Sequence, residues 1–119
     1  MTLRPYRPYD AESILAIYGP VVAQSSATFE TEVPSLHDLS ERLARIAGRF
    51  PFWVAVDPDG SVLGYAYGTT HRERISYQWA VETSVYVAPE AHRQGVGRAL
   101  YAALLPSLAE RGFVWAYGV

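Results

Sequence analysis

Hydrophobic and polar residues follow two different periods along this chain. Apolar residues three and four positions apart predict one helix that Asp10 caps, a second that Ser35 caps, and a third over residues 95–111. Short apolar or alternating runs predict strands over residues 2–6, 52–56, 62–69, 77–87 and 113–119. The pattern therefore predicts one domain in which strands and helices are mixed.

Glycine and proline predict where these elements turn or bend. Gly19-Pro20 predicts a break or kink in the first helix, and Pro106 predicts a bend in the last one. The sequence Asp57-Pro-Asp-Gly predicts a tight turn that joins two strands into a hairpin. We expect a loop or short extended chain over residues 25–31 and a loop over residues 72–76.

The strand predicted over residues 77–87 presents two different faces, because successive side chains point to opposite sides. The odd-numbered residues are mostly apolar, and the even-numbered residues suit a polar cavity. The even-numbered residues are Gln78, Ala80, Glu82, Ser84 and Tyr86. A carboxylate that faces a cavity can take a proton, so Glu82 is a candidate catalytic residue.

Residues 82–105 read as a strand, a glycine loop and a helix. A helix that begins in this way presents free backbone N–H groups, which bind anions. Gly95 and Gly97 have no Cβ, so an anion can approach the main chain closely. The amides expected to face the anion belong to Gln94, Gly95, Val96, Gly97 and Arg98. Arg93 and Arg98 would add charge-assisted contacts. The alternative is an ordinary helix start with solvated arginines.

Composition narrows the function classes. The chain has 119 residues, half of them hydrophobic, and a formal net charge of −2. This charge does not favour binding to nucleic acid or to an anionic membrane. No apolar run has the length of a membrane span and the N-terminus does not resemble a signal peptide, so we expect a cytoplasmic location. The absence of cysteine excludes disulfides, thiolate metal sites and a cysteine nucleophile.

Other candidate chemistries find little support in the sequence. His37 and His71 lack the spacing of metal ligands, so we expect no metal site. Ser84 has no His–Asp arrangement nearby, which argues against a serine nucleophile. A nucleotide-binding module is disfavoured, because the chain has no Gly-Lys-Ser/Thr sequence and no dinucleotide glycine fingerprint.

The strand, loop and helix of residues 82–105 resemble the acetyl-coenzyme A site of the GNAT superfamily of N-acetyltransferases. More narrowly, four segments are similar to the phosphinothricin and methionine sulfone or sulfoximine acetyltransferases: residues 3–5, 27–31, 52–55 and 77–87. The resemblance implies an α+β fold of three layers, with helices on both faces of a mixed, mostly antiparallel sheet. It also implies a single domain over residues 1–119.

Two features depart from the family's pattern. His92 stands at a loop position where the family usually has arginine or glutamine. The family also continues with another helix and two more strands, in a region that supplies an asparagine to the cofactor and, in many relatives, a tyrosine that protonates the leaving thiol. Because this sequence ends within a predicted strand, we expect the domain to be incomplete at its C-terminus.

The resemblance implies acetyl-coenzyme A as cosubstrate and a small amino-acid-like amine as acceptor. Glu82 would take a proton from the amine, directly or through a water; the alternative is a structural glutamate paired with an arginine. Main-chain N–H groups of Val85, Tyr86 and Val87 would polarise the thioester and pair with the pantetheine arm. The side chains of these residues can belong to the core at the same time.

Four residues are candidates for the acceptor site. Arg72 and Arg74 would bind a carboxylate of the acceptor, and the alternative is that both are solvated. Phe29 and Tyr77 would wall the pocket, and the alternative is ordinary core packing. We also expect a homodimer.

Two functions follow from these observations. The first is an N-acetyltransferase in which the amine attacks acetyl-coenzyme A directly in a ternary complex. The second is a truncated, catalytically silent domain that binds coenzyme A or acts only through assembly.

Overall fold

Five strands form one sheet in the order β1-β2-β3-β4-β5. They are β1 (Thr2–Pro5), β2 (Phe52–Val56), β3 (Val62–Ile75), β4 (Gln78–Val87) and β5 (Val114–Gly118). Neighbouring strands run antiparallel, except for β4 and β5, which run parallel. The computed structural model describes residues 1–24, 32–75, 78–91, 94–110 and 114–118; for residues 24, 70–75, 78–82 and 114–118 the description covers the main chain.

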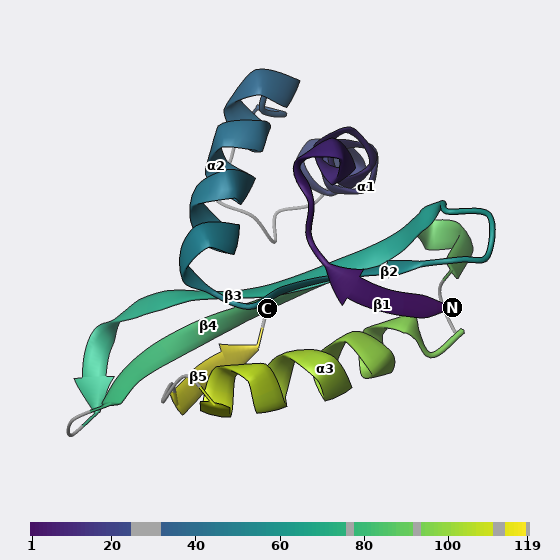
Figure 1. Cartoon of the computed structure of the whole chain (residues 1–119). Helices are drawn as coiled ribbons and strands as arrows, with labels where there is room; N and C mark the ends of the chain where they lie inside the picture. The colour runs from purple at the N-terminus through teal and green to yellow at the C-terminus, as the bar shows by residue number, and fades with distance from the viewer. Residues whose placement is uncertain (25–31, 76–77, 92–93, 111–113, 119) are drawn as a thin grey trace.

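In the described ranges, three helices cover the two faces of this sheet (Figure 1). The helices α1 (Ala11–Gln24) and α2 (Leu36–Arg49) lie on one face, and α3 (Val96–Glu110) lies on the other. Short 3-10 turns, η1 (Pro8–Asp10) and η2 (Pro89–Ala91), come before α1 and after β4. This arrangement confirms the predicted three-layer α+β fold. No helix in the described ranges is long and apolar enough to cross a membrane.

The stripe of apolar residues along α3 packs against the sheet. Val96, Leu100, Leu104 and Leu108 recur at every fourth position, and each is at most 2% exposed. Burial of one such side chain stabilises the fold by about 1.5–3 kcal/mol. Leucines are buried on both sides of Pro106, and the helix continues through this proline to Glu110. The packing of the stripe thus offsets the one backbone hydrogen bond that proline cannot make.

The N-terminal region differs from prediction in two ways. First, α1 continues through Pro20 to Gln24 without a break, so of the predicted break or kink only the kink stays a prediction. Pro20 is exposed, and its ring therefore displaces no core side chain. Second, Asp10 does not cap α1: its buried carboxylate accepts hydrogen bonds from the Arg4 guanidinium at 2.7 and 2.8 Å and from the Arg7 backbone N–H at 2.9 Å. The hydrogen bonds from Arg4 are charge-assisted and raise the pKa of that arginine. Such bonds are stronger than the neutral hydrogen bond of a helix cap, and they connect β1 to the start of α1.

Two other boundaries agree with prediction. The Ser35 hydroxyl caps α2 by accepting a hydrogen bond from the Asp38 backbone N–H at 3.1 Å. The turn between β2 and β3 closes when the Gly60 N–H donates to the Asp57 carbonyl at 3.0 Å. Gly60 has a φ of 92°, a conformation that favours glycine.

The strand β3 is longer than its sequence pattern predicts. It continues to Ile75, so most of the predicted loop over residues 72–76 is strand. Arg74 and Ile75 pair with β4, which supplies the hydrogen-bond partners that a local sequence pattern does not reveal. The predicted loop over residues 25–31 lies outside the described residues.

Candidate active site

An open groove of about 660 Å³ lies between the end of β4 and the first turn of α3. It is lined by Val85, Val87, Ala91, Gly95, Val96, Gly97 and Arg98. Six of these seven residues are among the predicted cofactor-binding positions. The fold thus places the end of the predicted strand and the start of the predicted helix around one groove. Ala91 was not predicted, and its small side chain next to the glycine loop is the one signal that pointed to it.

The main chain at the start of α3 faces the groove with groups that bind anions. Gly95 has a φ of 77°, which turns the chain into the helix at a conformation that favours glycine. The first helical hydrogen bond runs from the Ala99 N–H to the Gly95 carbonyl at 3.0 Å. The N–H groups of Val96, Gly97 and Arg98 come before this bond and therefore have no partner within the helix. Together with the helix dipole and the exposed Arg98 side chain, they favour a negatively charged ligand.

Gly97 keeps the groove open. The packing around it does not require a glycine. A Cβ at this position would meet only ordinary contact, 3.7 Å from a methyl carbon of Val87. Since Gly97 lines the groove, the absence of a side chain leaves room for a ligand to reach the main chain.

Gly64 on β3 is a glycine of the opposite kind, which the sequence analysis missed. A Cβ on Gly64 would lie 2.7 Å from the Tyr86 carbonyl oxygen and 3.2 Å from a methyl carbon of Val96. Glycine is therefore required here by the neighbouring strand β4, and its missing side chain also relieves a tight contact with α3. A glycine within a predicted strand is the signal that could have found it.

The strands β4 and β5 part beside the groove. Their pairing covers Ala80 to Thr83 and contains a register shift between Val81 and Glu82. Beyond Thr83, β4 continues along β3 to Val87, and within the described ranges no strand lies along its other edge. An exposed strand edge can pair with the main-chain-like amides of an extended ligand.

The position of Glu82 lies at this register shift, opposite Thr69 of β3 and Tyr117 of β5. Its side chain lies outside the described part of the chain, as do the side chains of Arg72 and Arg74. Phe29, Tyr77 and Arg93 also fall outside it. The catalytic role of Glu82 and the roles of these five residues stay predictions. Gln94 is described, and its side-chain amide donates to the Glu90 carbonyl at 3.2 Å.

Tyr86 points away from the groove, into an aromatic layer beneath α1. Its ring centroid lies 5.3 Å from that of Tyr65 and 5.5 Å from that of Tyr18. Tyr65 is 2% exposed, and burial raises the pKa of its hydroxyl far above the ordinary value. At this end of β4 the groove thus lies on the odd-numbered face, and the even-numbered face packs against rings rather than lining the polar cavity that the alternation predicted.

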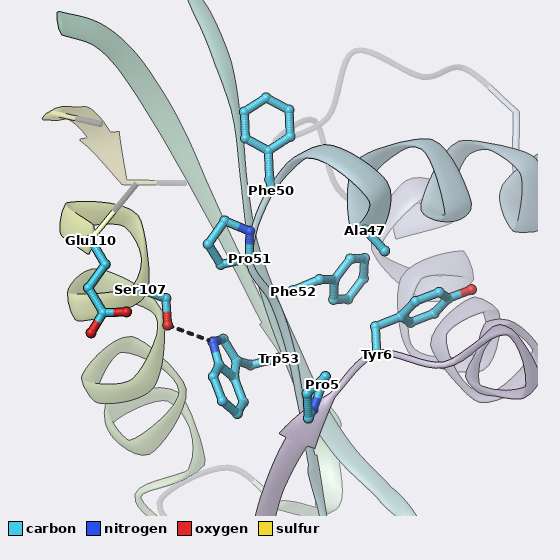
Figure 2. A pocket seen from close by; sticks show the side chains of 9 residues that line it. All are labelled: Pro5, Tyr6, Ala47, Phe50, Pro51, Phe52, Trp53, Ser107 and Glu110. Atoms are coloured by element: carbon cyan, nitrogen blue, oxygen red, sulfur yellow. Dashed lines mark hydrogen bonds between the residues drawn. The ribbon is translucent and has the colours of Figure 1, made fainter. Parts of the chain in front are cut away.

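A second cavity of about 250 Å³ lies at the other end of α3 (Figure 2). Trp53 points toward α3, where its indole N–H donates to the Ser107 hydroxyl at 3.2 Å; Phe52 and Tyr6 point to the opposite side of the sheet. The Ser107 hydroxyl in turn donates to the Ala103 carbonyl at 2.9 Å. The Trp53 indole and the Ser107 hydroxyl thus bond within the protein, and none of the predicted site residues lines this cavity.

Comparison with known proteins identifies the family. Residues 20–119 match the model of the acetyltransferase (GNAT) family. The chain belongs to this family. Over 104 residues it is 38% identical to the phosphinothricin N-acetyltransferase of Alcaligenes faecalis, and over 108 residues it is 36% identical to the L-methionine sulfoximine/L-methionine sulfone acetyltransferase of Pseudomonas aeruginosa. The matches cover 87% of this GNAT chain in each case, but 53% and 60% of the two relatives, so the chain spans little more than half of their length.

Solved structures support the same family. The chain is 40% identical to a GNAT superfamily phosphinothricin acetyltransferase from Sinorhizobium meliloti, solved in complex with AcCoA, with a TM-score of 0.80. The match covers 88% of this chain and 57% of that protein. A second structure, of yncA from Salmonella typhimurium with its cofactor acetyl-CoA, has 29% identity and a TM-score of 0.85, and the match covers 100% of this chain and 69% of that one.

Proposed function

We propose that this GNAT chain binds acetyl-coenzyme A and transfers its acetyl group to the amine of a small amino-acid-like acceptor. The observation that carries the proposal is the groove at the start of α3, where N–H groups and Arg98 face a space that Gly97 leaves open. The names of the similar proteins support the same reaction, since they include phosphinothricin and methionine sulfoximine acetyltransferases.

The residues of the groove fit coenzyme A. Its pyrophosphate would accept hydrogen bonds from the N–H groups of Val96, Gly97 and Arg98, and the Arg98 guanidinium would add charge. Its pantetheine arm would run along the edge of β4 past Val87 and Val85, where the strand is not covered by β5. Bound there, acetyl-coenzyme A supplies an acetyl thioester.

In the proposed reaction the acceptor nitrogen bonds to the acetyl carbon, and the carbon–sulfur bond breaks with its electron pair passing to sulfur. Coenzyme A leaves as a thiolate, which takes a proton from solvent water. An alkyl amine has a pKa of about 10 and is mostly protonated at neutral pH, so a base must remove its proton. Glu82 is the proposed base, acting directly or through a water. Arg72 and Arg74 are proposed to bind the acceptor's carboxylate, with Phe29 and Tyr77 as pocket walls.

The wider setting is part of the same proposal. One sheet and one continuous core support a single domain over residues 1–119. A cytoplasmic location and a homodimer are proposed from the sequence alone. The alternative of a catalytically silent domain is not favoured, because the named relatives are acetyltransferases.

The test is acetyl transfer to a panel of amines: phosphinothricin, methionine sulfoximine, methionine sulfone, and an alkyl amine without a carboxylate. Release of the coenzyme A thiol is followed for the wild type, for Glu82→Gln and for Glu12→Gln, a control at an exposed position on α1. We expect Glu82→Gln to lower kcat about a hundredfold or more and to leave the Kd for coenzyme A unchanged.

Two results would count against this proposal. An unchanged kcat in Glu82→Gln removes that residue from the role of base. Binding of coenzyme A without transfer to any amine of the panel removes the proposed acceptor class.

A further inference from the structure

Two hydroxyl groups meet where β4 and β5 part. Thr83 is the last residue of β4 that pairs with β5, opposite Gly118, and Thr83 is 2% exposed. Its Oγ1 lies 3.5 Å from the hydroxyl oxygen of Tyr101 on α3. Thr83 and Tyr101, which we call the hydroxyl pair, thus connect the strand and the helix at the point where the sheet begins to open.

The hydroxyl pair lies beyond the residues that line the groove, further along the same strand and the same helix. On β4, Thr83 is on the same face as the groove residues Val85 and Val87, because alternate residues share a face. On α3, Tyr101 follows Gly97 by four residues, so it lies one turn further along the same side of the helix. From Val87 to Thr83 the strand advances about 13 Å. A ligand anchored at the start of α3 and extended along β4 therefore runs toward this pair.

The pair supplies side-chain hydrogen-bonding groups that the β4 wall of the groove lacks. Val85 and Val87 offer only methyl groups from their side chains. The 3.5 Å between the two hydroxyl oxygens exceeds the usual distance of about 2.7–2.8 Å for such a bond, so the contact is weak. A tyrosine hydroxyl donates one hydrogen bond and also accepts, so Tyr101 can turn toward a polar ligand atom at little cost.

We propose that Tyr101 binds the pantetheine arm of coenzyme A and that Thr83 is a positioning residue whose weak contact orients the Tyr101 hydroxyl toward β4. The inference rests on the proposed function and deepens it. The pantetheine arm is a flexible chain whose methylene groups suit the valine walls. Its amide groups lose their hydrogen bonds to water when they enter the groove, and Tyr101 replaces one of them.

The test separates the arm of coenzyme A from its phosphates. Calorimetry measures the Kd of coenzyme A and of 3′-phospho-ADP, which has the nucleotide and pyrophosphate but no arm. We expect Tyr101→Phe to weaken coenzyme A binding about three- to tenfold and to leave 3′-phospho-ADP binding unchanged. Arg98→Ala, at the phosphate end, is expected to weaken both ligands.

Two further variants complete the design. Thr83→Val removes the positioning hydroxyl and is expected to weaken coenzyme A binding in the same direction, while Thr83→Ser keeps the hydroxyl and restores binding. Ser107→Ala is the matched control: it removes a hydroxyl from the same helix, but one that bonds Trp53 and Ala103 far from the groove. We expect it to lower the unfolding temperature without changing either Kd.

The outcomes distinguish this inference from the proposed function. If the folded wild type does not bind coenzyme A, the proposed function is wrong and the inference falls with it. If the wild type binds coenzyme A and Tyr101→Phe binds it equally well, only the inference is wrong. An equal loss of affinity for coenzyme A and 3′-phospho-ADP also overturns it, since this result indicates a general change in packing.

Discussion

The two faces of the sheet meet their helices with different side chains. On the face covered by α3, the strands present Gly64, Val85 and Val87, and the helix begins beside them. On the face covered by α1 and α2, the same two strands present Tyr65 and Tyr86. Short side chains let a helix N-terminus approach the strand and leave a groove, whereas rings fill the space. A single strand, β4, thus helps to build an open groove and a packed layer through alternate residues.

The largest expected effect comes from a substitution that places a bulky side chain in the groove. Gly97→Leu is expected to weaken coenzyme A binding at least a hundredfold, because the new side chain occupies the space where the pyrophosphate meets the main chain. The fold should tolerate the change, since the new Cβ makes only an ordinary contact and leucine favours helix over glycine by up to about 1 kcal/mol. Calorimetry and thermal unfolding measure the two effects.

Gly48→Leu is the matched control for this prediction. Gly48 lies in α2, and a Cβ there meets nothing within 4 Å. The control should keep full affinity for coenzyme A. Tight binding by Gly97→Leu would show that the ligand does not occupy this groove.

The second prediction concerns the close approach of α3 to the sheet. Gly64→Ala places a Cβ 2.7 Å from the Tyr86 carbonyl oxygen, which forces the strands or the helix to shift. We expect the free energy of unfolding to fall by about 1–3 kcal/mol, as in other overpacked sites. Urea unfolding measures the change, with Gly48→Ala as the control in open space. Equal stability of the two variants would contradict the conclusion that the packing around Gly64 requires a glycine.

The smallest effect is expected from the aromatic face and depends on pH. Burial raises the pKa of Tyr65, so the folded protein keeps this hydroxyl protonated at a pH where the unfolded chain ionises it. The stability linked to Tyr65 is therefore fully present below pH of about 10, the unfolded pKa, and is lost as the pH rises beyond it, by up to about 1.4 kcal/mol per pH unit.

Tyr65→Phe should reduce this alkaline loss. Urea unfolding at pH 8 and pH 11 compares the variant with the wild type and with Tyr9→Phe, a control at a residue that is 66% exposed. A slope between the two pH values that is the same in Tyr65→Phe and the wild type would mean that Tyr65 is not protected from ionisation.

Local sequence patterns predicted most elements of the fold, because helix stripes, caps and turns depend on neighbouring residues. The strand β2, the turn at Asp57 and the cap at Ser35 were predicted correctly for this reason. The break at Pro20 and the loop over residues 72–76 were not, because packing of the helix and pairing with β4 outweighed the local preference.

The candidate site also has a part that local sequence predicted and a part that only long-range contacts revealed. The glycine loop and the start of α3 were predicted, since their chemistry lies in consecutive residues. Gly64 and the hydroxyl pair were missed, because each depends on a contact between residues far apart in the sequence. Asp10 was recognised as important but given the wrong partner, because its ion pair with Arg4 forms only when β1 and η1 come together.

The sequence by itself determined the order of elements and the family resemblance, and it predicted that a glycine loop with free N–H groups follows a strand that contains Glu82. The tertiary structure decided on which face of β4 the groove lies, which glycine the packing requires and which one leaves room for a ligand. It also brought Tyr101 to Thr83. The physical reason is that hydrogen-bonding groups and short side chains become a site only when distant segments meet around a shared space.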